Sequence, residues 1–336
     1  MENALPPKVI ISQMIFGYVV AKSIYVASKL NLADLIAANG PMTTAALAAK
    51  SGAHEESLSR LLRALASAGI FSAGADGKYS LTPMAECLRE DSADSVKAMS
   101  LGTGNVFFNS MSELLSTVQT GEPGFPKAIG LLPFEYMGKY PDEAKIFDRM
   151  MTDIHGGETA PMIGTYDFSP FKTVVDIGGG NGEVITAILQ HFPGVHGVLF
   201  DLPHVIDRAA NNIVASGLSD RCELVGGSFF ETVASGGDAY IMRHIIHDWS
   251  DDEAVNILTN CRKAMNPGGK VLVVEAVIED GNGPSPFKWL DLSMLMIGGK
   301  ERTHAQFDII FTKAGLKLNR IVPFMHDLSV VEGIVM

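Results

Sequence analysis

The sequence predicts an α/β protein, in which a doubly wound and mostly parallel sheet follows a mainly α domain of winged-helix type. Its 336 residues, 47% of them apolar, suffice for about two domains with cores of their own. From Phe171 onward, short apolar segments alternate with helix-length amphipathic ones, as in a parallel sheet. Between Thr43 and Leu88, two short helical segments precede a glycine-rich hairpin, the pattern of a winged helix-turn-helix.

The pattern divides the chain into three parts. Residues 1–100 hold the winged-helix-like region, whose second helix carries Leu58, Leu61, Leu62 and Leu65 on one face. Residues 101–165 contain glycine- and proline-marked loops and then the helical run DEAKIFDRMMTDI, and we expect them to connect the domains and cover a site. Residues 166–336 form the predicted sheet domain.

An apolar segment extends from Val9 to Leu30, near the N-terminus. Because Gln13, Lys22 and Ser23 interrupt it, we expect it to be too polar to span a bilayer, and we expect no membrane partner. A helix that is apolar nearly all round is usually buried, yet a segment at this place has few neighbours in its own chain. The segment therefore predicts a homodimer, in which a second copy covers the helix.

The charge balance argues against nucleic acid as a partner. The chain has 26 basic and 38 acidic residues, a formal net charge of -12, whereas a protein that neutralises phosphates is usually basic. The winged-helix-like region has as many acidic as basic side chains. Cys87, Cys222 and Cys261 are far apart and odd in number, which indicates no disulfide framework and fits a cytoplasmic protein.

The sheet domain contains apolar segments of strand length. In chain order, the candidate parallel strands are TVVDI, GVLF, CELVG, AYIMR and KVLVVEAV. Ligands of such a sheet bind at the carboxyl ends of its strands. A final pair, LKLNRIVPF and SVVEGIVM, is expected to close the edge as an antiparallel hairpin.

The first of these strands leads into a glycine loop, VVDIGGGNGEV. Glycines at this place let a ligand lie against the backbone at a helix N-terminus. The dinucleotide fingerprint G-x-G-x-x-G is incomplete, because the sixth residue counted from Gly178 is Glu183. Asp201 ends the next strand, 23 residues after Gly178, where an acid can bind both hydroxyls of a ribose. Since NAD and S-adenosylmethionine both carry such a ribose, Asp201 does not separate them.

The third strand ends in the segment LVGGSFFE. Ser228 and Phe229 would stand there beside an adenine ring, the first as a polar neighbour and the second as a flat apolar wall. A lone aromatic such as Phe229 also fits an ordinary place in the core, which is the commoner case.

The stretch HIIHDWSDDE places two histidines before a run of acids, which suits a metal site or an acid-base site. Ser250 and Glu253 form a capping-box pattern, which assigns the acidic run to the start of a helix. The histidines His244 and His247 have no H-E-x-x-H pattern or further ligand cluster behind them. We therefore expect no metal.

A family resemblance rests on segments that agree in order and spacing: VVDIGGGNGE, FDLPHV, GGSFFE, RHIIHDWSDDE, MNPGGKVLVVEAV and GGKERTHAQF. With them the chain resembles the S-adenosylmethionine-dependent O-methyltransferases similar to plant caffeate and flavonoid enzymes, hydroxyindole O-methyltransferase and bacterial natural-product methyltransferases. The resemblance extends over most of the chain. The resemblance implies a winged-helix-like dimerisation domain over residues 1–100, helices covering the substrate site over 101–165, and a Rossmann-like catalytic domain over 166–336.

The resemblance also implies S-adenosyl-L-methionine as the cofactor, with S-adenosyl-L-homocysteine as the product. Gly178 would approach its methionine part, Asp201 would bind the ribose, and Ser228 and Phe229 would meet the adenine. Arg243 stands where the family usually has lysine, and Ser228 where plant members commonly have aspartate. A neutral serine should bind the adenine amino group less strongly than a carboxylate would.

The implied reaction is transfer of the methyl group to a phenolic or other aromatic hydroxyl of a small molecule, without a metal. A phenol has a pKa near ~10, so a base that removes its proton makes it a better nucleophile. His247, in the segment HDW, occupies the catalytic position of the family, whereas His244 is expected to be a packed, hydrogen-bonded residue. Glu275 and Glu301 match the two acids that flank the catalytic histidine, where a carboxylate would fix its tautomer.

A flat, apolar acceptor needs an apolar pocket. By position, Phe147 and Met151 in the covering helix and Met294 and Leu295 before GGKERT match pocket residues of the family. Methionine adapts well to aromatic faces, although a methionine stripe at helical spacing is more often core.

Other functions remain open from the residues. Relatives in aromatic polyketide pathways keep the fold but carry out hydroxylation or decarboxylation, and they generally lack the catalytic histidine. A ligand-sensing winged-helix regulator would bind DNA, which the acidic balance disfavours. A dehydrogenase is disfavoured by Glu183 in the glycine loop.

Overall fold

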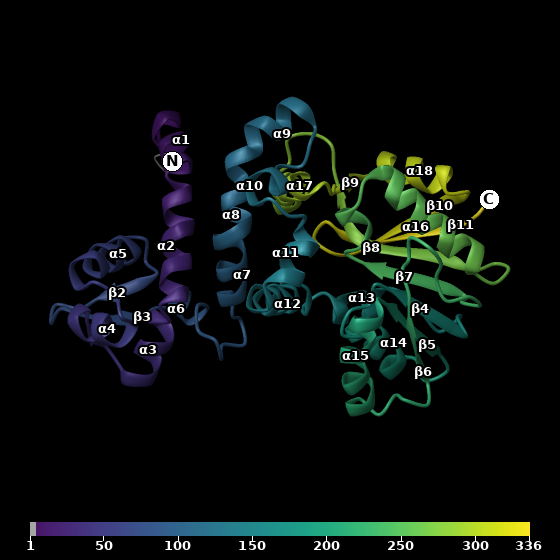
Figure 1. The fold of residues 1–336 in the computed structure, drawn as a ribbon, viewed down its shortest axis with the longest axis horizontal. Coiled ribbons are helices and arrows are strands. Elements are labelled where there is room, and N and C mark those ends of the chain that lie inside the picture. Colours follow the sequence, from purple (N-terminus) through teal and green to yellow (C-terminus); the bar gives the residue numbers. More distant parts are fainter. Residues whose placement is uncertain (1–4) are drawn as a thin grey trace. The chain divides into compact units, whose positions relative to one another are not determined.

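The computed structural model describes residues 5–336, and the chain forms two compact units (Figure 1). The first comprises Met1–Ser112 and Ala128–Gly156, and the second comprises Glu113–Lys127 and Gly157–Met336. The elements of the first unit are α1 (Pro7–Ile15), α2 (Gly17–Lys29), α3 (Leu32–Asn39), β1 (Met42–Thr43), α4 (Thr44–Ser51), α5 (Glu55–Ser67), β2 (Phe71–Ala73), β3 (Lys78–Leu81), α6 (Pro83–Glu86), α7 (Lys97–Gly102), the π-helix η1 (Thr103–Phe107), α8 (Phe108–Ser110), α11 (Pro133–Lys139) and α12 (Pro141–His155).

The winged-helix-like pattern of the first unit is confirmed. Thr43 caps α4 by accepting a hydrogen bond from the Ala46 N–H, and Gly52 ends the helix with a positive φ of 73°. Strand β3 pairs with both β1 and β2 in a small antiparallel sheet. Three of the predicted leucines of α5 are buried and Leu61 packs against the same core. The amphipathic face of α5 therefore holds this domain together.

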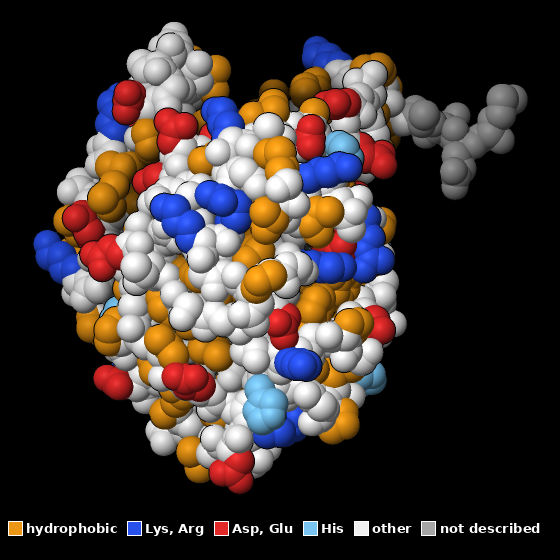
Figure 2. All heavy atoms as spheres, turned by 90° about the vertical axis from the view of Figure 1, so that its right-hand side faces the viewer, with side chains coloured by type: hydrophobic (Ala, Val, Ile, Leu, Met, Phe, Trp, Pro, Cys, Tyr) orange, Lys and Arg blue, Asp and Glu red, His pale blue; other side chains and the backbone are white. Residues whose placement is uncertain are grey.

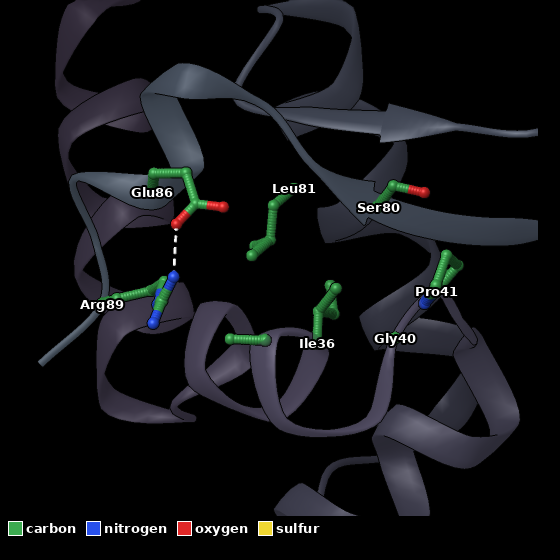
Figure 3. Close-up of a pocket in the computed structure, with 8 residues that line it drawn as sticks. Ile36, Gly40, Pro41, Ser80, Leu81, Glu86 and Arg89 are labelled. Atoms are coloured by element: carbon green, nitrogen blue, oxygen red, sulfur yellow. Dashed lines mark hydrogen bonds and ion pairs between the residues drawn. The ribbon is translucent and has the colours of Figure 1, made fainter. Parts of the chain in front are cut away.

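A cavity of about 260 Å³ lies in this unit, between α3 and the hairpin (Figure 3). Ile36 and Leu81 supply its apolar wall, and Arg89 pairs with Glu86 at its rim. Its lining residues all belong to the first unit, and none of them is a predicted site residue.

The N-terminal apolar segment forms α1 and α2, which are separated at Phe16. By length and by a mean hydropathy of 1.6, Pro7–Lys29 is long and apolar enough to cross a membrane. The prediction that it is too polar to do so is therefore wrong on composition. The reason is that Lys22 is the single strongly polar side chain of α2 before its last turn, so apolar residues dominate the mean hydropathy. In the folded chain the ammonium of Lys22 donates to the Gly104 carbonyl at 2.7 Å.

The second unit is built on the predicted sheet. Its helices and strands are α9 (Leu114–Thr120), most of α10 (Gly124–Ile129), α13 (Thr159–Thr165), β4 (Thr173–Ile177), α14 (Glu183–His191), β5 (His196–Asp201), α15 (Pro203–Ala215), β6 (Cys222–Gly226), β7 (Ala239–Arg243), the 3₁₀ turn η3 (Ile246–Asp248), α16 (Asp251–Ala264), β8 (Lys270–Ile278), α17 (Pro286–Ile297), β9 (Arg302–Thr303), α18 (His304–Lys313), β10 (Leu316–Met325) and β11 (Leu328–Val335).

The strand order of the large sheet is β10-β11-β8-β7-β4-β5-β6. Strands β4 to β8 run parallel, so the predicted α/β rhythm is confirmed. The C-terminal hairpin is also confirmed, and β11 inserts between β10 and β8, antiparallel to both. Because β4 lies between β5 and β7, the order reverses at β4, and the glycine loop follows the strand at this switch point.

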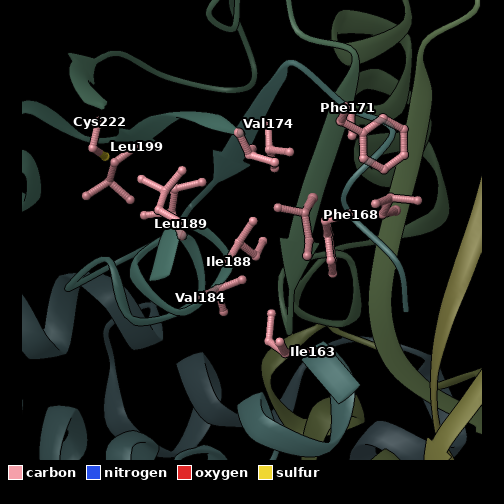
Figure 4. Packing of buried hydrophobic residues seen from close by; sticks show 14 of the residues in the cluster. Ile163, Phe168, Phe171, Val174, Val184, Ile188, Leu189, Leu199 and Cys222 are labelled. Carbon is pink, nitrogen blue, oxygen red and sulfur yellow. The ribbon is translucent and has the colours of Figure 1, made fainter. Parts of the chain in front are cut away.

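Helices cover both faces of this sheet (Figure 1). On one face, Ile185, Ile188 and Leu189 of α14 pack with strand residues such as Val174 and Leu199; Figure 4 shows part of this cluster. The other face is covered by α16 and α18. With both faces buried, the carboxyl edge of the parallel strands is the place where polar side chains can gather around a ligand.

Candidate active site

The glycine loop takes up backbone conformations that favour glycine. Gly178, Gly180 and Gly182 have φ values of 64°, 57° and 81°, and α14 begins directly after them at Glu183. A Cβ on Gly178 would lie 2.6 Å from Cδ1 of Ile245, whereas a Cβ on Gly180 would meet nothing within 4 Å. The loop therefore packs tightly at its start and leaves space at its tip.

Asp201 ends β5 and faces this loop. Its Oδ2 accepts a hydrogen bond from the Gly180 N–H at 2.9 Å, and its Oδ1 accepts one from the Leu202 N–H at 2.6 Å. Each carboxylate oxygen has two lone pairs, so each can accept a further hydrogen bond from a ligand. The structure thus brings together the two features that the sequence predicted for a ribose site.

Ser228 and Phe229 follow β6 at the same edge of the sheet. Both are half-buried, and a Cβ on Gly178 would lie 3.7 Å from Cε1 of Phe229, which places this ring beside the glycine loop. The ring also packs at an angle against Phe230 and Trp249, with centroid distances of 4.9 and 6.0 Å. Phe229 is therefore both part of the core and a wall of the loop region.

Arg243, the last residue of β7, binds the side chains of Thr159 and Glu183. Its Nη1 donates to Oγ1 of Thr159 at 2.7 Å, and its Nη2 lies 3.3 Å from Oε2 of Glu183. Thr159 also donates to Oε1 of Glu183, which closes a small network at the start of α14. Sequence reasoning treated Glu183 only as a missing glycine; no signal in the sequence indicated its pairing with a residue 60 positions away.

Asp176 is a second residue that the sequence did not single out. It lies in β4, is 1% exposed, and its Oδ2 has no hydrogen-bond partner within the described residues. Burial raises the pKa of Asp176 to about 7, against the positive charge of Arg243, which favours the carboxylate. In the sequence, the only indication of Asp176 was that it is a polar residue within the apolar segment VVDI.

His247 lies in η3, just past β7, and is 7% exposed. Its Nδ1 is 2.7 Å from Oε1 of Glu301, and its backbone N–H donates to Oε1 of Glu275 at 3.0 Å. The Nε2 atom lies 3.7 Å from Oδ1 of Asp248, which is too long for a hydrogen bond. The structure therefore gathers the three predicted catalytic residues, with Nδ1 engaged by a carboxylate.

The charges around His247 favour its protonated form. Burial works in the opposite direction, but the carboxylates of Asp248, Glu301 and Glu275 together raise the pKa of His247 to about 10. Burial also raises the pKa of Glu275 to about 7, although the charge of His247 opposes this. The second carboxylate oxygens of Glu275 and Glu301 are buried without a hydrogen-bond partner in the described part of the chain.

The segment between α17 and β9 packs closely against η3. The N–H of Lys300 donates to the His247 carbonyl at 2.7 Å, and Oδ1 of Asp291 accepts the Glu301 N–H at 2.8 Å. Gly299 passes so close to η3 that a Cβ there would lie 2.2 Å from the His247 carbonyl oxygen. Only glycine fits this approach, and the sequence indicated it only as part of the motif GGKERT.

We expect the change Gly299→Ala to displace η3, because no side chain is compatible with 2.2 Å between Cβ and a carbonyl oxygen. The free energy of unfolding should fall by roughly 1–3 kcal/mol, the usual cost of overpacking. Turnover should fall by about 10²-fold, because the ring of His247 moves. Thermal unfolding and kcat measure both effects, and Gly283→Ala, where a Cβ meets nothing within 4 Å, is the control.

The other parts of HIIHDWSDDE have structural roles. Ser250 and Glu253 form the predicted capping box at the start of α16. His244 lies one residue past β7 with a φ of 54°, and its Nε2 is 2.7 Å from Oε2 of Glu158. This agrees with the expected packed, hydrogen-bonded histidine, although its backbone lies outside the strand. A side chain at positive φ is strained, and the buried carboxylate of Glu158 helps to hold it there.

The predicted pocket residues lie in different units. Met294 and Leu295 lie near the end of α17, where their carbonyls accept hydrogen bonds from the N–H groups of Gly299 and Gly298. Phe147 and Met151 lie on α12 of the first unit, where the ring of Phe147 is 6.1 Å from that of Phe107.

The mostly parallel sheet, the glycine loop at the switch point and the Asp201 carboxylate define an α/β domain of the nucleotide-binding class. The chain belongs to the O-methyltransferase family, because the family's O-methyltransferase domain matches residues 111–317 and its dimerisation domain matches residues 12–91.

Similar proteins extend this match over nearly the whole chain. Phenazine O-methyltransferase PhzM of Lysobacter antibioticus is 42% identical over 332 residues, which cover 98% of this chain and 97% of the relative. The mitomycin biosynthesis 6-O-methyltransferase of Streptomyces lavendulae is 36% identical over 306 residues, 90% of this chain and 87% of the relative.

A solved structure with bound ligands also superposes well. NcsB1, an O-methyltransferase from neocarzinostatin biosynthesis in complex with S-adenosylmethionine and 2-hydroxy-5-methyl naphthoic acid, has a TM-score of 0.86 and 33% identity. The match covers 94% of this chain and 96% of NcsB1. The protein is thus an S-adenosylmethionine-dependent O-methyltransferase. The site fits this cofactor. Backbone N–H groups fix both carboxylate oxygens of Asp201, and a Cβ on Gly180, at the tip of the glycine loop, would meet nothing within 4 Å.

Proposed function

We propose that the protein methylates an aromatic hydroxyl group of a small natural product, with His247 as the general base. The observation that carries this proposal is the buried imidazole of His247, whose Nδ1 is engaged by Glu301. An imidazole held in this way directs Nε2 to the hydroxyl of an acceptor. The relatives support an aromatic acceptor, because a naphthoic acid is bound in NcsB1 and a phenazine is named for PhzM.

The residues around His247 serve the proton transfer. Glu301 fixes the tautomer and stabilises the imidazolium that forms when the acceptor loses its proton. Glu275 holds the backbone of His247 in place through its N–H. The bound cofactor supplies the methyl group, and the protein's main contribution is to line up the acceptor oxygen with it.

We also propose roles for the cofactor-binding residues. Asp201 binds the ribose hydroxyls, Gly178 lets the methionine part approach the backbone, and Ser228 and Phe229 flank the adenine. Arg243 acts indirectly, because its guanidinium ties the start of α14 to β7 through Glu183. Met294 and Leu295 contribute apolar contacts to the acceptor, and Phe147 and Met151 of the helical region 101–165 stay predicted acceptor-binding residues.

Incubation with S-adenosylmethionine and a panel of naphthols, hydroxyphenazines and hydroxybenzoates tests the function. We expect a monomethyl ether from at least one of them, detected by mass spectrometry, and no dependence on added or chelated metal. If calorimetry showed cofactor binding but no acceptor were methylated, the aromatic acceptor class would be wrong. Hydroxylated or decarboxylated products would favour the alternative chemistry of this fold.

The pH dependence tests His247 as the base. Only the neutral imidazole accepts a proton, and the surrounding carboxylates raise the pKa of His247 to about 10, so kcat/KM should rise with pH through the neutral range. Glu301→Gln removes one of these carboxylates, which should lower the pKa of His247 and move the rising limb to lower pH. Profiles from about pH 6 to about pH 10.5 measure this shift. Ionisation of the free acceptor is the same for both enzymes, so identical limbs would contradict the role of His247.

We propose that the protein is a cytoplasmic homodimer that pairs through α1 and α2. Apolar side chains stay exposed along these helices in the single chain: Val9, Ile10, Ile11, Met14, Ile15, Phe16, Tyr18, Val19 and Val20. Such a continuous apolar face usually marks an interface. The match of the dimerisation domain to residues 12–91 supports pairing in place of a membrane span.

The change Ile11→Glu with Ile15→Glu places two charges on one face of α1, because the residues are one helical turn apart. We expect the mass in light scattering to fall from that of a dimer to that of a monomer. Val214→Glu, at another exposed apolar residue, should leave the mass unchanged. A dimer mass in the double variant would contradict this interface.

We expect no binding to nucleic acid. On the face of the molecule in Figure 2, basic and acidic side chains are interspersed. The net charge of -12 also opposes binding to phosphates. A gel shift with duplex DNA at low salt would favour the regulator alternative.

A further inference from the structure

Arg302 binds the backbone on both sides of His247. Its side chain is 0% exposed, and it directly follows Glu301 in the chain. Its Nη1 donates to the Ile246 carbonyl and its Nη2 to the Trp249 carbonyl, both at 2.9 Å. Its Nε and Nη2 also donate to Oδ1 of Asp251, at 3.1 and 2.9 Å.

These bonds matter because η3 has little structure of its own. It is a single 3₁₀ turn, Ile246–Asp248, between β7 and α16, and a single turn is not stable by itself. The two carbonyls that Arg302 binds bracket the turn, and the Asp251 carboxylate anchors the guanidinium at the start of α16. A planar guanidinium can hold such groups at once, whereas an ammonium is a single point.

We propose that Arg302 is a positioning residue for methyl transfer, which holds the backbone of η3 so that the His247 ring meets the Glu301 carboxylate. Arg302 thus holds the backbone of η3, and its chain neighbour Glu301 holds the ring of His247. This inference rests on the proposed role of His247 as the base.

The test is Arg302→Lys, which keeps the positive charge but cannot bind both carbonyls and Asp251 together. We expect kcat to fall by about 10- to 100-fold, the usual result of a small misplacement of a catalytic group. The Kd for S-adenosylhomocysteine should stay within about 3-fold, because a change of 10-fold needs a difference of about 1.4 kcal/mol that no lost contact supplies. The rising limb of the pH profile should also shift, which a purely structural residue would not cause.

Arg221 provides a matched control. Its guanidinium also donates to backbone carbonyls, those of Leu189, Pro193 and Val195. These bonds lie near the amino ends of β5 and β6, whereas the site lies at the carboxyl ends of the strands. We expect both Arg221→Lys and Arg302→Lys to lower the melting temperature by a few degrees, and Arg221→Lys to leave kcat and its pH profile unchanged. Equal losses of kcat in both variants would overturn the proposal, because they would report general destabilisation.

If Arg302→Lys does not fold, Asp251→Asn takes its place. This variant weakens the anchor of the guanidinium and should lower kcat in the same direction, by a smaller factor; an unchanged kcat would overturn the proposal. His247→Ala in the same assay separates the two hypotheses. If His247→Ala is as active as the parent, the role of the base is wrong; if it is inactive while Arg302→Lys behaves as the parent, only the role of Arg302 is wrong.

Discussion

The change His247→Ala is expected to lower kcat by roughly 10²–10⁴-fold, the usual effect of losing a general base. The physical reason is that Glu301 engages the Nδ1 of His247 and Glu275 holds its backbone, which leaves Nε2 as the ring atom that can accept the proton. The imidazole of His244, whose ring centroid is 5.2 Å away, has its Nε2 against Glu158 and so does not replace His247. Cofactor affinity should change little, because the glycine loop and Asp201 do not contact His247 through any hydrogen bond of the described residues.

The measurements are the initial rate of ether formation and calorimetry with S-adenosylhomocysteine. His196→Ala, at an exposed histidine at the start of β5, is the control for losing an imidazole and should keep full activity. A parallel loss of turnover and cofactor binding in His247→Ala would show that the histidine is structural. At high pH the deficit should shrink, because a phenol with a pKa near ~10 then loses its proton without a base.

The second large effect is expected at Asp201. The change Asp201→Ala removes both oxygens that are proposed to bind the ribose, and the hydrogen bonds that hold the Gly180 and Leu202 N–H groups. Hydrogen bonds to a charged group contribute about 1.5–3 kcal/mol each, so the Kd for S-adenosylmethionine should rise by at least about 10²-fold. The KM for the cofactor should rise accordingly, while kcat at saturating cofactor changes less.

Asp207→Ala, at an exposed position of α15, removes the same charge from the same unit and should leave cofactor affinity unchanged. Circular dichroism and the melting temperature show whether Asp201→Ala has folded. A folded Asp201→Ala protein with parental affinity would mean that the carboxylate serves only to hold the glycine loop. The ribose would then need another partner.

Local patterns predicted much of this architecture. The strand segments from TVVDI to SVVEGIVM form β4 to β8, β10 and β11. The apolar runs of β4, β7 and β8 are buried on both faces, as is usual for strands of a parallel sheet. Ser250 and Glu253 predicted the start of α16, because a capping box uses only neighbouring residues. The expectation that this N-terminal segment is too polar to span a bilayer was wrong, because it weighed single polar residues and not the mean hydropathy of Pro7–Lys29.

Local spacing and periodicity predicted the order of strands and helices and the glycine loop with Asp201. The resemblance of whole motifs to a known family, and not spacing alone, predicted the roles of His247, Glu275 and Glu301. The tertiary structure alone decided which distant groups meet: Arg243 with Glu183, and Arg302 with the carbonyls beside His247. These contacts join residues more than 50 positions apart, so no periodicity or spacing in the chain encodes them. They arise where parallel strands end at one edge of a sheet and bring unrelated segments within hydrogen-bond distance.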